Sequence, residues 1–241
     1  MVAFGSLFDK TTCGFIKGIP FCDHFHGLKS AAGGGLRIGL KYGIICAYRK
    51  VETMTAIIDY KAGNLTSVKN AFAALGAATI VTRAADVIRA AERVVFPGVG
   101  AAKSAMANLQ ELGLIDAVKS AAVSGKPFLG ICLGMQILFE HSEEDGGVDT
   151  LGILPGRVKR FPDVKGFKVP EIGWNQVNGK TDYYFVHSYY AEKCPFTVGV
   201  TEYAGIEFTS AVKKGALVAY QFHPEKSGKA GLELLKEFMS C

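Results

Sequence analysis

One cysteine stands in a setting that could make it a nucleophile. Cys132 lies in Gly130-Ile131-Cys132-Leu133-Gly134, after the apolar run Pro127-Phe128-Leu129 and before a pattern typical of a helix, Ile137-Leu138-Phe139-Glu140. The spacing Gly-x-Cys-x-Gly is the thiol version of a nucleophile elbow, a sharp turn between a strand and a helix. Small residues on both sides let the strained turn close without a Cβ clash. Unpaired N–H groups and the dipole at a helix start would favour the thiolate, so the pattern predicts a reactive sulfur.

A histidine far downstream could serve as the base for this thiol. His223 follows the strand-like run Leu217-Val218-Ala219-Tyr220, and Glu225 comes two residues later. An imidazole there could take and return the cysteine proton, while Glu225 could fix its tautomer and orientation. The alternative is a buried cysteine and an unrelated surface histidine. Because both motifs fall at the ends of predicted strands, we interpret them together as a catalytic pair.

Length and composition fit one globular domain in a reducing compartment. The chain has 241 residues, of which 49% are hydrophobic, which suffices for one substantial core. The six cysteines (13, 22, 46, 132, 194 and 241) show no paired spacing of a disulfide or zinc framework. With a thiol nucleophile among them, a cytoplasmic location is expected. No run reaches the roughly 18 apolar residues of a membrane helix, so we expect no membrane partner.

The first 53 residues differ from the rest. They hold seven Lys or Arg and three Asp or Glu, hence +4 of the formal charge of +5, so the basic balance does not indicate a nucleic-acid partner. Cys22-Asp23-His24-Phe25-His26 matches no zinc spacing, and we expect no metal. The stretch is glycine-rich, lacks periodicity and does not resemble a secretory signal. We expect residues 1–53 to be a weakly ordered N-terminal extension and residues 54–241 to form the functional domain.

From Met54 onward, short apolar strands alternate with helices. Strands are predicted at 55–60, 79–82, 93–96 and 127–129, and helices at 63–75, 86–91, 102–112 and 115–124. This alternation predicts an α/β fold with an open, mostly parallel central sheet and helices on both faces. Beyond Gly147 the pattern changes, which predicts short antiparallel strands in the C-terminal half. Short strands are expected in this half at 157–161, 175–177, 183–186, 196–203, 206–212 and 217–220, before a last amphipathic helix at 229–239.

The predicted strand ends gather the candidate residues. Open α/β sheets bind ligands at the carboxyl ends of their strands, where Asp59-Tyr60, Pro97-Gly98-Val99-Gly100, Cys132 and His223 would meet. The turn Gly98-Val99-Gly100 could offer a backbone N–H to an oxyanion. It could equally be a plain turn that ends its strand.

These residues resemble a known family. Gly130-Ile131-Cys132-Leu133-Gly134-Met135-Gln136 together with His223-Pro224-Glu225 is similar to the class I, or triad, glutamine amidotransferases. More specific strings resemble the glutaminase subunit of imidazole glycerol phosphate synthase, a family of histidine biosynthesis, from about Met54 to Met239. They are Ile58–Asn64, Pro97–Gly100, Gly173-Trp174-Asn175, Tyr184–Tyr189 and Gln221–Gly228.

The resemblance implies an enzyme that hydrolyses glutamine to glutamate and ammonia without a cofactor. It implies a heterodimer in which a separate (β/α)8-barrel cyclase subunit uses the ammonia to make imidazole glycerol phosphate and an aminoimidazole carboxamide ribonucleotide. By family position, Cys132 is the nucleophile, His223 the base and then the acid, and Glu225 its orienter. Oxyanion and glutamine contacts fall on Gly98, Val99, Gly100, Leu133, Gln136, His187, Ser188 and Tyr189. Partner contacts fall on Ala62, Asn64, Trp174, Tyr184 and Lys226.

Two positions depart from the family pattern, and several alternatives stay open. Glu171 stands where the family has His, and Lys61 where it often has Gly; both lie near the expected subunit face. Trp174 and Tyr184 could instead be core residues, and Lys226 a solvated lysine. The other functions are an amidotransferase for anthranilate or pyridoxal phosphate synthesis, a non-catalytic binding module on this scaffold, and a stand-alone cysteine protease.

Overall fold

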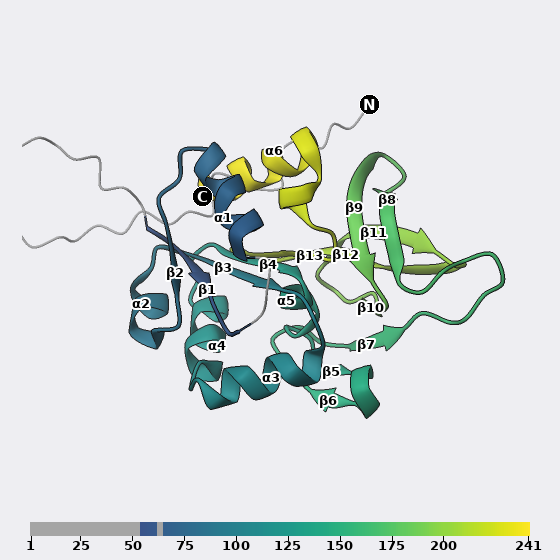
Figure 1. The fold of residues 1–241 in the computed structure, drawn as a ribbon, viewed down its shortest axis with the longest axis horizontal. Helices are drawn as coiled ribbons and strands as arrows, with labels where there is room; N and C mark the ends of the chain where they lie inside the picture. Colours follow the sequence, from purple (N-terminus) through teal and green to yellow (C-terminus); the bar gives the residue numbers. More distant parts are fainter. Residues whose placement is uncertain (1–53, 62–64) are drawn as a thin grey trace, which may run out of the picture.

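The computed structural model describes residues 54–61 and 65–241. The expected extension 1–53 and two expected partner contacts, Ala62 and Asn64, lie outside the described residues. A large sheet crosses the described part, with helices on both sides of one half and a separate hairpin beside the other half (Figure 1). This arrangement confirms the predicted α/β fold class.

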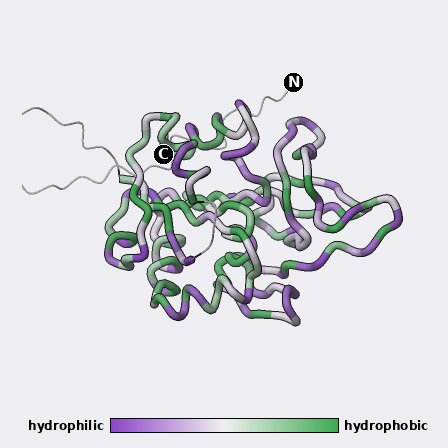
Figure 2. The backbone as a smooth tube through the Cα atoms, viewed as in Figure 1, coloured by the Kyte–Doolittle hydropathy of each residue, from purple (hydrophilic) through white to green (hydrophobic). Residues whose placement is uncertain are grey.

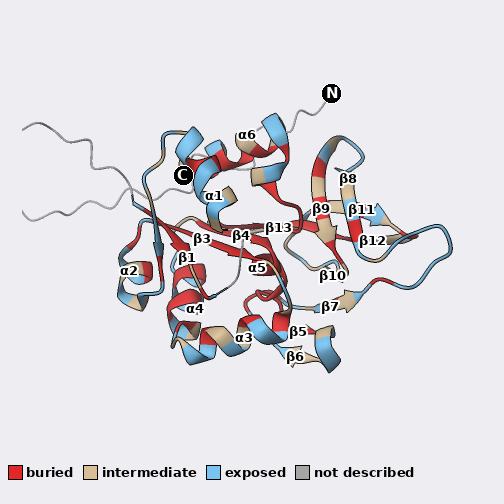
Figure 3. Ribbon diagram, in the orientation of Figure 1, coloured by how far each residue is buried: buried red, intermediate tan, exposed pale blue. Residues whose placement is uncertain are grey.

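Five neighbouring strands form the parallel half of the large sheet. In spatial order they are β2 (Thr79–Thr82), β1 (Thr55–Ile58), β3 (Arg93–Gly98), β4 (Phe128–Cys132) and β13 (Leu217–Tyr220). Every residue of β1, β3, β4 and β13 is buried (Figure 3). Burial on both faces explains why these strands are short apolar runs without alternation, and Figure 2 shows hydrophobic stretches along the central strands.

Helices cover the two faces of this half. One face packs against α1 (Leu65–Ala74) and α6 (Gly228–Met239), through side chains such as Phe72 and Phe238. The opposite face packs against α2 (Ala85–Ala90), α3 (Ala102–Glu111) and α4 (Ile115–Val123), through Ile88, Leu109 and Val118. The sheet is thereby held from both sides next to the strand ends that carry the candidate residues.

Mostly antiparallel strands form the other half. After β13 the sheet continues through β12 (Ile206–Lys214), β10 (Tyr189–Ala191), β7 (Arg157–Arg160), β5 (His141–Ser142) and β6 (Val148–Asp149), and β11 (Thr197–Tyr203) pairs with β12. Among the described strands of this half, only β5 and β7 pair in parallel. A separate hairpin joins β8 (Glu171–Val177) to β9 (Thr181–His187), turning at Asn178 and Gly179, both with positive φ. Along β8 buried or half-buried residues alternate with exposed ones, as expected for a strand with one face toward the core.

The helix after the elbow begins and ends earlier in the chain than the sequence pattern predicts. The pattern at 137–140 was expected to be helical, but α5 spans Leu133–Gln136 and ends there. Residues 137–139 are fully buried, and their carbonyl oxygens accept hydrogen bonds from the segment 151–154 instead of from the next turn of a helix. The dipole of one helical turn is weak, so the N–H groups at its start, which have no partner within the helix, remain the stronger support for a thiolate.

Candidate active site

The nucleophile elbow has the strained geometry that its sequence predicts. Cys132 ends β4 with φ 53° and ψ −112°, outside the regions that L-residues prefer, and directly precedes α5. A Cβ added to Gly134 would collide with the Phe96 carbonyl oxygen of β3, and one added to Gly130 would lie 2.9 Å from the Ala219 Cβ of β13. The glycines are therefore required because β3 and β13 pack closely on both sides of the turn.

The candidate base approaches from the neighbouring strand. β13 pairs in parallel with β4, and His223 follows it by three residues. His223 is buried, its Nδ1 lies 2.8 Å from Glu225 Oε1, and its Nε2 has no aligned hydrogen-bond partner among the described residues. Its backbone is also fixed, since its N–H donates to the Tyr184 carbonyl and its carbonyl accepts from the Ser227 hydroxyl.

The charges of this pair reinforce each other. Burial lowers the pKa of His223, but the charge of Cys132 and the contacts with Cys132 and Glu225 outweigh it and raise the pKa to about 10. A protonated His223 in turn stabilises negative charge on the sulfur. The two groups share one proton, which belongs to the pair and not to either residue alone.

One cavity brings most of the expected residues together. Its volume is about 280 Å³, at the lower end of small-molecule sites. It is lined by Val99, Gly100, Cys132, Leu133, Gln136, Glu144, Pro170, Val186, His187, Ser188, Tyr189 and His223. Gly98 is not in this lining. It pairs with Cys132 in the sheet, and a Cβ there would collide with the Tyr60 hydroxyl, so close packing accounts for that glycine.

Gln136 lines the cavity and also holds neighbouring segments in place through hydrogen bonds. Its Nε2 donates to the Tyr189 carbonyl at 2.7 Å and to Gln221 Oε1 at 3.0 Å. Both amide hydrogens are therefore used within the protein, which leaves the side-chain oxygen of Gln136 for a ligand.

Sequence reasoning missed Glu144. This residue begins the short helix η1 (Glu144–Gly146), lines the cavity, and its Oε2 accepts a hydrogen bond from the Ala102 N–H at 2.6 Å. Burial raises the pKa of Glu144, the Ala102 N–H opposes that rise, and Asp145 adds to it. The sequence offered only the acidic run Glu143-Glu144-Asp145, which is typical of a solvated surface and gave no reason to select one member.

Three of the expected partner contacts meet on the surface. The hairpin register places Trp174 opposite Tyr184, with ring centroids 6.2 Å apart, and Lys226 Nζ lies 5.8 Å from the centre of the Tyr184 ring. Trp174 is 58% exposed and Ile172 63% exposed, which is unusual for large apolar side chains. We call the patch of Ile172, Trp174, Tyr184 and Lys226 the hairpin face.

The described part of the chain has neither a cluster of metal-binding side chains nor a membrane-spanning helix. Within 54–61 and 65–241, no three His, Cys, Asp or Glu side chains are grouped to hold a metal ion. None of the helices in those ranges combines the length and the apolar composition of a membrane span.

Comparisons with known proteins agree with the site. The family described as glutamine amidotransferase class-I matches residues 56–240. Imidazole glycerol phosphate synthase subunit HisH of Moorella thermoacetica is 50% identical over 197 residues, which cover 76% of this chain and 92% of the relative. The HisH subunit of Methanothermobacter thermautotrophicus is 48% identical over 198 residues, 77% of this chain and 98% of the relative. A solved structure described as a glutamine amidotransferase has the same fold, with a TM-score of 0.59 at 20% identity over 77% of this chain and 97% of its own.

Proposed function

The chain belongs to the class-I glutamine amidotransferase family and, within it, to the HisH subunits of imidazole glycerol phosphate synthase, and on that premise we propose how its residues act. It hydrolyses glutamine to glutamate and ammonia as the glutaminase subunit of that synthase, in histidine biosynthesis. One observation carries the residue assignments. Cys132 and His223 reach the same cavity from adjacent parallel strands, with Glu225 directly behind the histidine.

The triad carries out the hydrolysis in two steps. The Cys132 sulfur attacks the side-chain amide carbon of glutamine, and His223 gives its proton to the amide nitrogen as the C–N bond breaks and ammonia leaves. A water molecule, deprotonated by His223, then attacks the thioester and releases glutamate and the free thiolate. Glu225 keeps Nδ1 of the imidazole protonated and oriented throughout, as supported by their 2.8 Å contact.

The negative oxygen formed in each step needs backbone donors. Leu133 begins α5, so its N–H is one of the helix-start groups that have no partner within the helix. We assign it to the oxyanion together with an N–H of Val99 or Gly100, which line the same cavity. Removal of one such donor typically costs a factor of about 10²–10³ in rate.

The rest of the cavity suits the amino-acid end of glutamine. Glu144 is the one acidic side chain among the described residues that line it, so we assign it to the α-ammonium group. We assign the space for the α-carboxylate to the segment His187-Ser188-Tyr189, which lines the same cavity. Gln136 fastens that segment through the Tyr189 carbonyl.

We assign the hairpin face to the partner. The proposed partner is the (β/α)8-barrel cyclase subunit, which receives the ammonia, and exposed Trp and Tyr side chains are typical of the central contacts of protein interfaces. Ala62 and Asn64 are proposed as further contacts from their family positions. We propose no nucleic-acid partner, and a cytoplasmic location because the thiol nucleophile must stay reduced.

The decisive experiment removes the Cys132 sulfur by mutation and supplies ammonia, the product of glutamine hydrolysis, from outside. In the complex with the cyclase subunit, Cys132→Ala is expected to abolish glutamine turnover, while added ammonium still supports the cyclase reaction. Cys194→Ala, which alters another free cysteine, is the matched control and should keep normal turnover. Normal glutaminase activity in purified Cys132→Ala protein would refute the assignment.

A further inference from the structure

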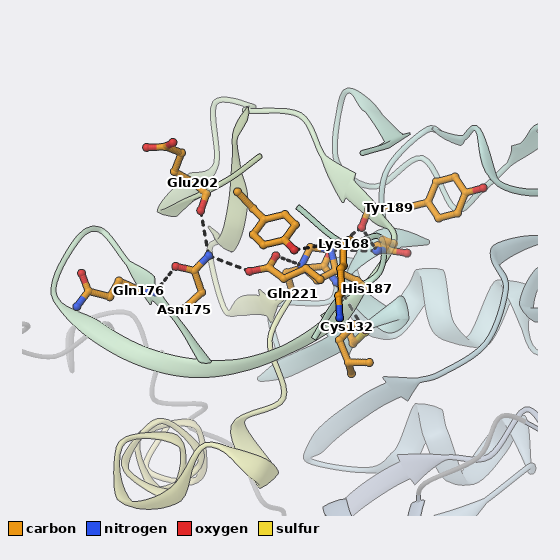
Figure 4. A network of polar contacts seen from close by, with 12 residues as sticks. Cys132, Lys168, Asn175, Gln176, His187, Tyr189, Glu202 and Gln221 are labelled. Atoms are coloured by element: carbon orange, nitrogen blue, oxygen red, sulfur yellow. Dashed lines mark hydrogen bonds and ion pairs between the residues drawn. The ribbon is translucent and has the colours of Figure 1, made fainter. Parts of the chain in front are cut away.

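A line of polar contacts runs from the exposed hairpin into the core (Figure 4). It begins at Asn175 of β8, whose Nδ2 donates to Glu171 Oε1 at 2.8 Å. The other oxygen of Glu171, Oε2, lies 3.0 Å from Nε2 of His187 on β9, and the two side chains are only 4% and 2% exposed. The hairpin register places Glu171 directly opposite His187, so the pair is built into the strand pairing.

The line continues to the nucleophile. His187 Nδ1 lies 2.8 Å from the Tyr189 carbonyl oxygen, which also accepts the 2.7 Å hydrogen bond from Gln136. Gln136 donates to Gln221 Oε1, and Gln221 Nε2 lies 3.7 Å from the Cys132 sulfur. Each link joins a buried or half-buried group, and together they connect the hairpin to the elbow.

The Glu171–His187 contact must contain a proton. The Tyr189 carbonyl can only accept, so Nδ1 of His187 carries a hydrogen. A neutral imidazole would then direct the lone pair of Nε2 at a carboxylate oxygen, which is repulsive. The contact is attractive only when a further proton sits on Nε2 or on Glu171, and neither Nε2 nor Oε2 has an aligned hydrogen bond in the part of the chain that the structure describes.

The surroundings of His187 make this partner necessary. The rings of Phe161, Phe185 and Phe208 lie around the imidazole, with centroid distances of 5.3, 5.6 and 5.3 Å. Apolar rings cannot replace the hydration that a polar or charged imidazole loses on burial. The Glu171 carboxylate offsets this loss at Nε2 of the imidazole.

We propose that Glu171 is a positioning residue for glutamine binding, acting through His187. The inference rests on the proposed function, because it concerns the wall of the same cavity. His187 lies in the middle of the strand end 186–189, where the Val186 carbonyl is 3.9 Å from the Cys132 sulfur and the Tyr189 carbonyl holds Gln136. Without the carboxylate, the buried imidazole loses its partner and this wall of the cavity shifts.

The test compares three substitutions in the full-length chain bound to its cyclase subunit. Glu171→Leu is expected to raise KM for glutamine about tenfold or more and to change kcat by less than about threefold, because the wall binds substrate but does not react. Glu171→Gln is expected to bring KM back to within about threefold of the wild type, since an amide can accept from Asn175 and donate to a neutral His187. Glu207→Leu, the same change at an exposed glutamate of β12, is the matched control and should leave KM unchanged.

Thermal unfolding of each variant separates positioning from packing. A lower melting temperature with unchanged KM in Glu171→Leu would show a purely structural role and overturn the proposal. If that variant does not fold, Glu171→Asp decides, because its carboxylate is one methylene too short to keep both contacts. A KM raised several-fold supports the proposal and an unchanged KM overturns it. Failure of the proposed function would look different, as absent glutamine turnover in the wild-type complex.

Discussion

The parallel strands and the β8–β9 hairpin contribute to one cavity in different ways. Cys132 is the last residue of β4 and His223 follows β13, and both strands are buried along their whole length between two layers of helices. Val186 and His187 of the cavity wall, and Ile172, Trp174 and Tyr184 of the hairpin face, belong to a two-stranded unit with one exposed side. A strand end in a doubly covered sheet cannot move without disturbing the core, which suits a nucleophile. A two-stranded hairpin is marginally stable alone, so its position depends on a few anchoring contacts.

One of these anchors joins the two regions directly. The Tyr184 carbonyl of β9 accepts from the His223 N–H at 2.9 Å, and the Tyr184 N–H donates to the Ser227 hydroxyl at 3.0 Å. The ring of Tyr184 belongs to the hairpin face, next to Trp174. A partner that binds this face therefore contacts the strand that holds the backbone of the catalytic base. We therefore expect substitutions in the parallel region to lower the rate of catalysis, and substitutions in the hairpin to weaken binding of glutamine or of the partner.

The largest effect is expected from His223→Ala, in the parallel region. Without the base, the rate of glutamine turnover should fall by a factor of about 10⁴ or more, nearly the loss expected for Cys132→Ala, because triad members act as a unit. Glu225→Gln should be milder by about one to two orders of magnitude, since this residue orients the base and transfers no proton. Steady-state kinetics of the complex measure both. A larger loss for Glu225→Gln than for His223→Ala would contradict the assigned roles.

A smaller effect is expected at Glu144, which lies in the cavity outside both regions. Glu144→Gln should raise KM for glutamine about 10- to 100-fold with little change in kcat, because it removes a charge-assisted bond to the α-ammonium group. Since burial raises the pKa of Glu144, the carboxylate is lost as the pH falls through a value above the ordinary range for glutamate. The wild-type KM should therefore rise on mild acidification, while the KM of Glu144→Gln should not follow it. If KM changes with pH in the same way in both proteins, Glu144 does not bind the substrate.

Trp174→Ala, in the hairpin, is expected to weaken partner binding while it leaves the isolated chain almost unchanged. The loss of an exposed aromatic anchor should weaken binding of the cyclase subunit by about 1–3 kcal/mol, while the melting temperature of the isolated chain changes little. Calorimetric titration of the partner measures this. Val123→Ser, at an exposed apolar residue of α4 outside the hairpin face, is the control and should bind normally. Unchanged affinity in Trp174→Ala would place the partner elsewhere.

The parallel region was also the part that could be predicted from the sequence. The strands at 55–58, 93–98, 128–132 and 217–220 are short apolar runs bounded by turn residues, so the local pattern identified their ends within three residues. Because parallel strand ends share one edge, the joint position of Cys132 and His223 followed from the strand pattern alone.

The features that escaped prediction depend on contacts between distant segments. The expected helix at 137–140 was wrong because its carbonyls pair with residues 151–154, which no local pattern contains. The position of Glu171 opposite His187 needs the register of the β8–β9 pairing, sixteen positions apart in the chain. Glu144 reaches the cavity because its carboxylate binds the N–H of Ala102, far away in the sequence.

The smallest effect is expected from deletion of residues 1–53, which we propose neither region requires. The family match begins at residue 56, and the first strand that the structure describes, β1, begins at Thr55, so we expect this strand to form without residues 1–53. The deletion removes +4 of the net charge of +5 and should lower nonspecific binding to anionic surfaces, while kcat, KM and partner affinity stay unchanged. This prediction would fail if the extension packed against β2. β2 is an edge strand, and its Ile80 and Val81 are 38% and 37% exposed, an apolar edge that an added segment could cover. If the extension packs there, the truncated chain will melt several degrees lower than the full chain, and Ile80→Thr will lower the melting temperature of the full chain more than that of the truncated one. Equal melting temperatures of the two chains, measured by calorimetry, are the expected result, with the domain from residue 54 stable on its own.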